Sequence, residues 1–300
     1  MLIPPYLKPG DTIGIVSTAS KIERDAVMPA VELLQNVGFE VCLGASVFAK
    51  NHQFAGHDAL RTADLQQMMD DKRVKAILCS RGGYGTLRTL QQLDWKKFET
   101  HPKWIIGFSD VTVLHLALNT KRIASLHGVM PKYFVESGQA SNSFRTLLNA
   151  LAGGENQYTA PASQYNIEGS AEAELVGGNL SILFSLRGTP FDIDTRGKIL
   201  FIEDLAEYYY HIDRMMMNLK TGGVLSGLKG LIVGGFSGLL DNETPYGYTL
   251  QQIILDAVKE YQFPVAFDFP IGHQPDNFAL KTGCVAKLEV SEQGTKFTQK

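Results

Sequence analysis

The sequence is poor in the features that mark several specialised classes of protein. It has only three cysteines in 300 residues, and Cys42, Cys79 and Cys284 lie far apart in apolar, strand-like segments. Reduced cysteines in a protein core usually have this setting, and no CxxC pair indicates a zinc or redox site. We therefore expect neither a disulfide framework nor a metal site.

Long apolar runs and one-sided charge are also missing. No apolar run approaches the roughly 18 residues that indicate a membrane span. The segment MLIPPYLKPGDTIGIV lacks the positive start and the continuous apolar stretch of a signal peptide. Lysine plus arginine number 28 and aspartate plus glutamate 31, without a basic stripe or an acidic run. These absences predict a cytoplasmic protein without a membrane or nucleic-acid partner.

What is present is the composition of an ordinary globular protein, with 44% hydrophobic and 20% charged residues. The chain is too long for one typical core of about 100 to 200 residues, so we expect two domains, with a single large domain as the alternative. In the first half, apolar runs alternate with helical periodicity, which predicts an α/β domain with a parallel sheet. Its strands are predicted at residues 12–16, 40–43, 74–80, 103–107 and 123–126, and its helices at 24–36, 58–71, 86–93 and 111–119.

The second half is also predicted to be α/β. Its strands are predicted at residues 198–202, 228–233, 265–269 and 284–290, and its helices at 211–219 and 250–261. Between the halves, AGGENQYTAPASQYN is rich in turn-forming residues and indicates a connector. The predicted organisation is an N-terminal domain at 1–135, a connector at 136–168 and a C-terminal domain at 169–300.

Two loops of the first half follow predicted strands at their carboxyl ends, where open parallel sheets bind ligands. The loop RGGYG at residues 81–85 contains glycines that allow sharp turns and expose N–H groups. Ser109 follows the next strand in GFSDVT, where Gly107 relieves crowding. This turn is similar to a nucleophile elbow, although the motif G-x-S-x-G requires glycine where Val111 stands. The alternative is that Ser109 is the N-cap of the following helix.

Two residues of the second half are further candidates. Glu203 closes a predicted apolar strand, although such carboxylates are usually solvated or cap helices. His273 lies in the loop PIGHQPDN, and loop histidines are functional more often than core histidines. His127 follows a strand and ranks below His273, whereas packing in a helix accounts for His115.

Together these motifs resemble the family of L,D-carboxypeptidases and microcin-immunity proteins. RGGYG, GFSDVT, FIED and the late GH occur in the family's order along the chain. The resemblance extends over nearly the whole chain through PPYLKPGDTIGIV, FAGHDALRTADL, VGGNLSILFSLRGTP and YYYHIDRMMMNL. One departure is the exit of the first strand, Ser17-Thr18-Ala19-Ser20, where relatives commonly have a proline-containing turn.

The resemblance implies a flavodoxin-like N-terminal domain, a smaller α/β C-terminal domain and an active site in the cleft between them. Ser109 is then the nucleophile, His273 its general base and Glu203 the acid that orients His273. For the oxyanion hole we expect the backbone N–H groups of Gly83 and Asp110. Arg81, Gly82 and Tyr84 are candidates for substrate binding.

The implied activity is release of the terminal D-alanine from a murein tetrapeptide by cleavage of an L,D-peptide bond in peptidoglycan recycling. The family also implies a homodimer and no metal or organic cofactor. One alternative is a microcin-immunity-type peptidase acting on a peptide–nucleotide conjugate, with Trp104 or the tyrosines at residues 208–210 exposed as a platform for the base. Another is a non-catalytic module that binds a phosphate or flavin at RGGYG. Against it, the loop has neither of the phosphate-binding patterns G-x-x-x-x-G-K-[ST] and G-x-G-x-x-G.

Overall fold

The computed structural model describes all residues from Met1 to Lys300. The chain forms two compact units. The N-terminal unit contains Met1–Gly154 and a late segment, Phe278–Gly283, and the C-terminal unit contains Glu155–Asn277 and Cys284–Lys300. The predicted α/β class, with a parallel sheet and two domains, is confirmed.

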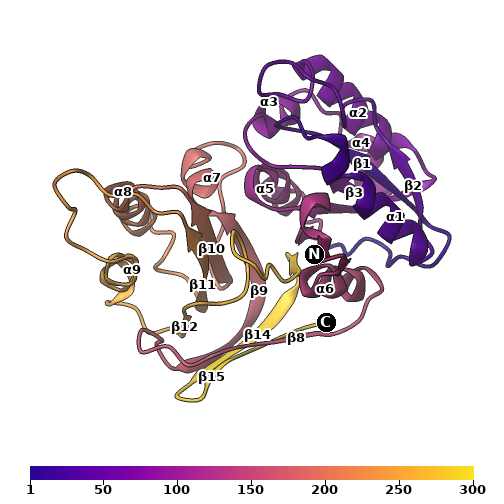
Figure 1. Ribbon diagram of the computed structural model, residues 1–300. Coiled ribbons are helices and arrows are strands. Elements are labelled where there is room, and N and C mark those ends of the chain that lie inside the picture. Colours follow the sequence, from indigo (N-terminus) through magenta and orange to yellow (C-terminus); the bar gives the residue numbers. More distant parts are fainter. The chain divides into compact units, whose positions relative to one another are not determined.

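The N-terminal unit is built on a six-stranded sheet with the order β13-β5-β4-β3-β1-β2 (Figure 1). Strands β1 to β5 are parallel in the order 2-1-3-4-5, which is the order of flavodoxin-like folds, and β13 is antiparallel at the edge. The strands are β1 (Thr12–Val16), β2 (Glu40–Leu43), β3 (Val74–Cys79), β4 (Trp104–Gly107), β5 (Ser125–His127) and β13 (Leu280–Thr282).

The central strands of this sheet have the continuous apolar sequence that burial on both faces requires. All of β4 is buried, and in β3 only Lys75 is exposed. The helices that follow the strands are α1 (Met28–Asn36), α2 (Asp58–Asp70), α3 (Thr86–Leu90), α4 (Lys96–Thr100), α5 (Thr112–Thr120) and α6 (Asn142–Leu151). Short 3-10 turns lie at Arg24–Ala26, Ser109–Val111 and Pro131–Tyr133, and β6 (Val135–Glu136) pairs with β7 (Gln139–Ala140).

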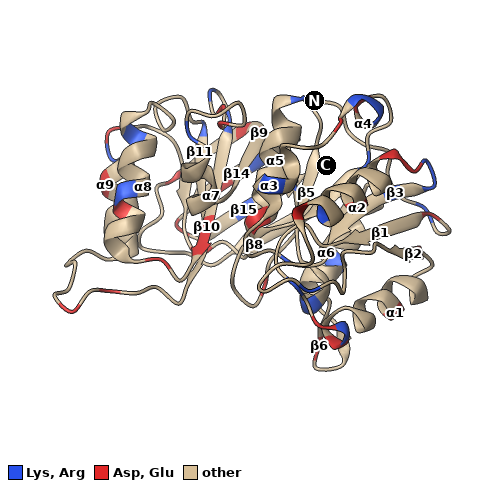
Figure 2. Ribbon diagram, turned by 90° about the horizontal axis from the view of Figure 1, so that it is seen from above, with Lys and Arg blue, Asp and Glu red and all other residues tan.

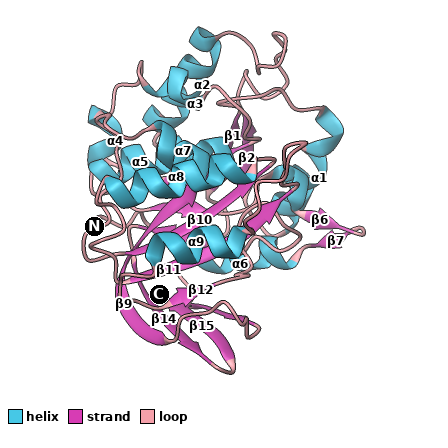
Figure 3. Cartoon of the chain, turned by 90° about the vertical axis from the view of Figure 1, so that its left-hand side faces the viewer, coloured by secondary structure: helices cyan, strands magenta, loops and turns pink.

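The C-terminal unit contains a seven-stranded mixed sheet with the order β12-β11-β10-β9-β14-β15-β8. Its strands β9 to β12 are parallel, and β14, β15 and β8 are antiparallel. Helices α8 and α9 lie side by side over the parallel strands (Figure 3). The elements are β8 (Asn156–Ala160), β9 (Gly169–Asn179), α7 (Leu180–Ser185), β10 (Ile199–Leu205), α8 (Tyr209–Thr221), β11 (Gly230–Ser237), α9 (Leu250–Val258), β12 (Val265–Ala266), β14 (Val285–Ser291) and β15 (Gly294–Gln299).

The prediction missed strands β8, β9, β13 and β15. A further difference from the predicted elements concerns Glu203. The prediction ended the strand at residue 202, but β10 continues to Leu205, so Glu203 lies inside a strand. Its partner in the parallel neighbour β9 is Asn179, and the pairing with β11 shifts register between Ile202 and Asp204. Two carboxylates after an apolar run look like a strand end, yet here the backbone pairing continues through them.

Candidate active site

Ser109 occupies a strained turn between β4 and α5. It is the first residue of the 3-10 turn Ser109–Val111 and has φ of +63°, a left-handed conformation that is uncommon for residues other than glycine. At Gly107, with φ of +156°, an added Cβ would lie 2.8 Å from Val111 Cγ2. Gly107 therefore leaves room for the Val111 side chain. The sequence predicted that this glycine relieves crowding in the turn. The result is a sharp strand-to-helix turn, similar in geometry to a nucleophile elbow.

The side chain of Ser109 does not cap a helix. The N-cap residues of the 3-10 turn and of α5 are Phe108 and Val111, and neither helix start has a side-chain cap hydrogen bond. The N-cap interpretation of Ser109 is therefore wrong, and the strained backbone needs another explanation.

The RGGYG loop approaches Ser109 through Gly82. A Cβ at Gly82 would lie 2.8 Å from Ser109 Cβ, 2.9 Å from Ser109 Oγ and 3.4 Å from the Asp110 nitrogen. Gly83 has φ of +115° and lies against Ser20 instead, where an added Cβ would be 2.8 Å from Ser20 Cβ. Gly82 thus keeps open a small space that borders both the serine hydroxyl and a backbone N–H group.

The carboxylate of Asp110 connects the Ser109 turn to the helix after RGGYG. It is 2% exposed, and its Oδ2 accepts a hydrogen bond from the backbone N of Thr86 at 2.9 Å, the first residue of α3. Burial raises the pKa of the Asp110 carboxyl. The hydroxyl groups of Thr86 and Thr18 are 2.9 Å apart, so the exit of β1 joins the same buried network.

The two remaining predicted residues of the loop differ in their contacts. Arg81 is exposed and donates a hydrogen bond from Nη1 to the carbonyl oxygen of Lys21 at 2.8 Å, which braces the loop. Tyr84 is 52% exposed, and its ring lies 6.2 Å from the ring of Phe54.

In the C-terminal unit, Glu203 and His273 form a direct pair. Glu203 is fully buried, and its Oε2 accepts hydrogen bonds from His273 Nδ1 at 2.5 Å and from the His273 backbone N at 3.2 Å. Gly272, with φ of +88°, lies so close that an added Cβ would be 2.6 Å from Glu203 Cγ. When Nδ1 carries the proton and donates it in a hydrogen bond to the carboxylate, the basic lone pair of the neutral imidazole is on Nε2.

The side chain of Asp204, next to Glu203, contacts the start of α7 instead of His273. Its carboxylate accepts hydrogen bonds from Asn179 Nδ2 at 2.9 Å, the Ser181 backbone N at 2.8 Å and the Leu205 backbone N at 2.9 Å. Burial and then repulsion from Glu203 raise the pKa of Asp204 to about 6. Successive residues of a strand point to opposite faces, so this acidic pair at β10 (Figure 2) divides between His273 and the start of α7.

Two other histidines are buried in the N-terminal unit. His115 Nε2 donates to the Gly107 carbonyl at 2.9 Å, and its Nδ1 accepts from Ser125 Oγ at 2.8 Å. Burial lowers the pKa of His115 to about 4, so the ring is neutral. His127 is also fully buried, and its ring lies 6.0 Å from that of Phe108. Sequence reasoning assigned His115 to packing, but it did not foresee that the ring holds the carbonyl of Gly107, which precedes the Ser109 turn.

Other features bear on cofactors and alternatives. The structure contains no group of three or more His, Cys, Asp or Glu residues that could hold a metal ion, and no helix is long and apolar enough to cross a membrane. Trp104 is fully buried, so the hypothesis that it forms an exposed platform is wrong. Tyr208 and Tyr210 are more than one-third exposed, with ring centroids 5.6 Å apart.

Comparisons with known proteins agree with this fold and these motifs. Residues 13–128 match the LD-carboxypeptidase N-terminal domain, and residues 172–288 match the LD-carboxypeptidase C-terminal domain. A Bacillus subtilis protein named "Probable murein peptide carboxypeptidase" is 35% identical over 295 residues, covering 97% of this chain and 92% of that protein.

Solved structures show the same relationship. The crystal structure of muramoyltetrapeptide carboxypeptidase from Oxalobacter formigenes is similar with a TM-score of 0.86 and 27% identity, covering 96% of this chain and 98% of that one. The structure of MccF in complex with glutamyl sulfamoyl guanosine shares the fold, with a TM-score of 0.88, 20% identity and coverage of 100% and 99%. The resemblance drawn from the motifs is thus confirmed, and the chain belongs to the LD-carboxypeptidase family of peptidases.

Proposed function

We propose that this chain is a serine carboxypeptidase that cleaves an L,D-peptide bond and releases the terminal D-alanine of a murein tetrapeptide in peptidoglycan recycling. The observation that carries the proposal is the left-handed backbone of Ser109 beside the space that Gly82 leaves open. The names of the relatives from Bacillus subtilis and Oxalobacter formigenes support a murein peptide as the substrate.

Ser109 attacks the carbonyl carbon that precedes D-alanine, and His273 Nε2 takes the hydroxyl proton as the bond forms. Glu203 holds His273 by Nδ1 and offsets the charge of the imidazolium. His273 then gives the proton to the leaving amine, and water hydrolyses the acyl-enzyme. The N-terminal unit supplies the nucleophile, and the C-terminal unit supplies the base and its acid.

The backbone N–H groups of Asp110 and Gly83 stabilise the oxyanion of the tetrahedral intermediate. Two features support this role for Asp110. Asp110 is the second residue of a helical turn, where N–H groups have no partner within the helix. The space left by Gly82 borders both its nitrogen and Ser109 Oγ. Donors fixed before the reaction lose no energy to reorganisation when charge develops.

Arg81, Gly82 and Tyr84 contact the substrate in this proposal. Arg81 uses Nη1 to brace the loop, and a guanidinium has further N–H donors for a substrate carboxylate. The sequence favours a cytoplasmic location. By family resemblance the enzyme is a homodimer that needs no metal or organic cofactor. Light scattering coupled to size exclusion tests the homodimer, and activity in the presence of a chelator tests the independence from metal.

The deciding experiment incubates the purified protein with L-Ala-γ-D-Glu-meso-diaminopimelate-D-Ala and follows the release of D-alanine by mass spectrometry. Ser109→Ala is expected to release none. Ser137→Ala is the matched control, because Ser137 is an exposed serine with a left-handed backbone, φ of +50°, outside the site. Full activity of Ser109→Ala would remove the nucleophile assignment.

A peptide–nucleotide conjugate is the alternative substrate. The observation that favours it is the exposed tyrosine pair Tyr208 and Tyr210, since aromatic rings stack on nucleobases. Glutamyl sulfamoyl adenosine in the same assay separates the two substrates. Faster turnover of the conjugate than of the tetrapeptide, with loss of that preference in Tyr208→Ala, would favour the alternative.

A further inference from the structure

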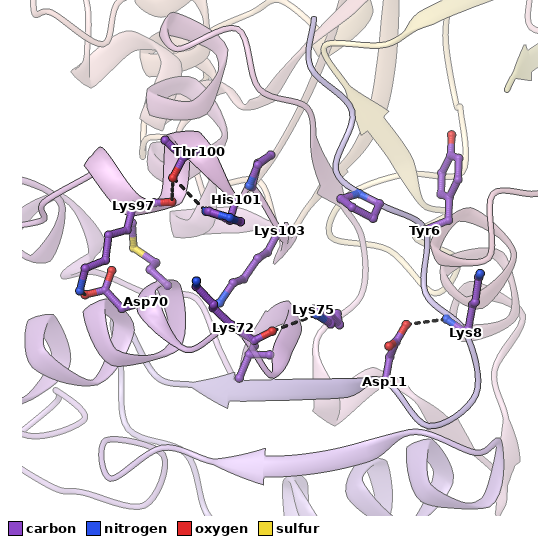
Figure 4. A pocket seen from close by; sticks show the side chains of 14 residues that line it. Tyr6, Lys8, Asp11, Asp70, Lys72, Lys75, Lys97, Thr100, His101 and Lys103 are labelled. Atoms are coloured by element: carbon purple, nitrogen blue, oxygen red, sulfur yellow. Dashed lines mark hydrogen bonds and ion pairs between the residues drawn. The ribbon is translucent and has the colours of Figure 1, made fainter.

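A cavity of about 810 Å³ opens at the amino edge of the N-terminal sheet (Figure 4). Among its lining residues, Asp11 directly precedes β1, Val74 begins β3 and Lys103 directly precedes β4. Ser109 follows β4 and therefore lies at the opposite edge of the same sheet. Ligand pockets commonly have volumes of about 300–1,000 Å³. The cavity can thus hold a small organic molecule, and it contains none of the residues proposed for catalysis.

One wall of the cavity is apolar and held in place. Trp104 is fully buried, and its Nε1 donates to the carbonyl oxygen of Pro5 at 3.1 Å. The ring of Tyr6 stacks on Trp104, with centroids 6.0 Å apart and an angle of 23° between the planes. Met69 and Val74 add aliphatic surface to the lining. An apolar ring or chain therefore meets a preformed surface here.

The lining is also strongly cationic. Two aspartates, Asp11 and Asp70, face an excess of lysines (Figure 4). Lys97 is 3.2 Å from Asp70, and Asp11 accepts a hydrogen bond from the backbone N of Lys8. The lysines are Lys8, Lys72, Lys75, Lys97 and Lys103.

Part of this charge stabilises the fold. Lys103 is 5% exposed and donates to the carbonyl oxygens of Met68, at 2.7 Å, and Asp71, around the end of α2. Burial lowers the pKa of Lys103 to about 8. Lys75 likewise donates to the carbonyl oxygen of Lys72 at 2.9 Å. Lys103 thus lies at the C-terminus of α2, where cations are favourable, and Lys75 is held by the turn that follows α2, so neither lysine needs a ligand.

Lys8 and Lys72 have no such explanation. Both are exposed, and neither ammonium group forms an ion pair or hydrogen bond with the protein. We propose that the cavity binds a small organic anion, a carboxylate or a phosphate on an apolar ring or chain. Lys8 lies beside Tyr6 on one side of the cavity, and Lys72 lies on the other side (Figure 4). The anionic group is bound by one of these two lysines, and the apolar part lies against the apolar lining.

Isothermal titration calorimetry with 2-naphthoate, 2-naphthyl phosphate and neutral 2-naphthalenemethanol tests the proposal. At least one anion is expected to bind to a single site at least tenfold more tightly than the neutral probe. The preference between the two anions distinguishes a carboxylate ligand from a phosphate ligand. Equal affinity for anionic and neutral probes, or no binding of either anion, would overturn the proposal.

Variants then locate the binding. The double variant Lys8→Glu/Lys72→Glu should weaken binding of the anion at least tenfold, and Thr100→Trp should obstruct the cavity without changing its charge. Lys229→Glu is the matched control, because Lys229 is an exposed lysine of the C-terminal unit without an ion pair. Ser109→Ala should bind the anion as the wild type does. Unchanged affinity in both cavity variants, or lost affinity in Ser109→Ala, would show that the cavity is not the site.

Discussion

Gly82→Ala should remove most catalytic activity while leaving the fold intact. Gly82 does not have the left-handed backbone that disfavours other residues, so alanine is compatible with its conformation. The added Cβ would lie 2.9 Å from Ser109 Oγ and 2.8 Å from Ser109 Cβ. Contacts of this length force a shift, and the shift must come from the serine side chain or from the turn that carries it.

The expected loss of kcat follows from the position of the added methyl group. It enters the space between Ser109 Oγ and the Asp110 nitrogen, 3.4 Å from that nitrogen, where the proposed oxyanion develops. Loss of one oxyanion donor typically lowers kcat by about 100- to 1,000-fold, or roughly 3 to 4 kcal/mol. We expect a loss of this size in kcat. The KM should change little because the obstruction acts mainly on the transition state. Crowding of the turn should also lower the stability of the unit by about 1–3 kcal/mol.

The assay is steady-state release of D-alanine, together with thermal unfolding to confirm that the variant is folded. Gly128→Ala is the matched control, since its added Cβ would approach no atom closer than 3.5 Å. If folded Gly82→Ala retained kcat within threefold of the wild type, the oxyanion would not lie beside Gly82, and the reasoning from this contact would be wrong.

Three further predictions concern carboxylates and a histidine. Glu203→Gln should lower kcat by about 1,000- to 10,000-fold because the His273 imidazolium loses its counter-charge. The control is Asp204→Asn, because the Asp204 side chain contacts α7, and it should lower kcat less than tenfold in the same assay. Asp110→Ala should lower kcat because the Thr86 N–H loses its acceptor, whereas Asp110→Asn should recover most of it; equal loss in both variants would contradict this role. The folded-state pKa of His115 lies at about 4, below its usual 6.5, so its contribution to stability is full above pH 6.5 and is lost as the pH falls to 4. Urea unfolding should therefore show that the free energy of unfolding falls by about 3 kcal/mol less in His115→Gln than in the wild type between pH 7 and pH 4. An equal fall in both proteins would contradict the burial of a neutral ring.

The sequence was most informative where burial dictates composition. The run from Val74 to Cys79 and the run from Trp104 to Gly107 are apolar because both faces of these strands are covered, and the strands lie where the pattern predicts them. Several strands, including β9 and β13, were not predicted. The strand β13, Leu280–Thr282, is specified by pairing with β5, a partner far away in the sequence, and not by its own composition.

The site was predictable only in part. The family resemblance named Ser109, but no local pattern distinguishes a serine in a strained left-handed turn from a serine that caps a helix. Only the structure excludes the cap, because Ser109 lies inside the 3-10 turn and its side chain forms no cap hydrogen bond. Glu203 resembled a solvated strand-end carboxylate because its partner, His273, is 70 residues further along the chain. A buried carboxylate becomes understandable only when its hydrogen-bonding partner is known.

The two edges of the N-terminal sheet have opposite electrostatic character for a single reason. In a parallel sheet covered by helices, the helices begin near the carboxyl ends of the strands and end near the amino ends. Helix starts carry partial positive charge and N–H groups without partners, which suits the oxyanion proposed beside Asp110. Helix ends carry partial negative charge, which explains why Lys103 lies at the end of α2. Lys103 satisfies that attraction and Lys75 binds the turn after α2, so the ammonium groups of Lys8 and Lys72 remain without a partner in the protein. An anionic ligand at the amino edge would balance this excess without competing for the groups that act on Ser109.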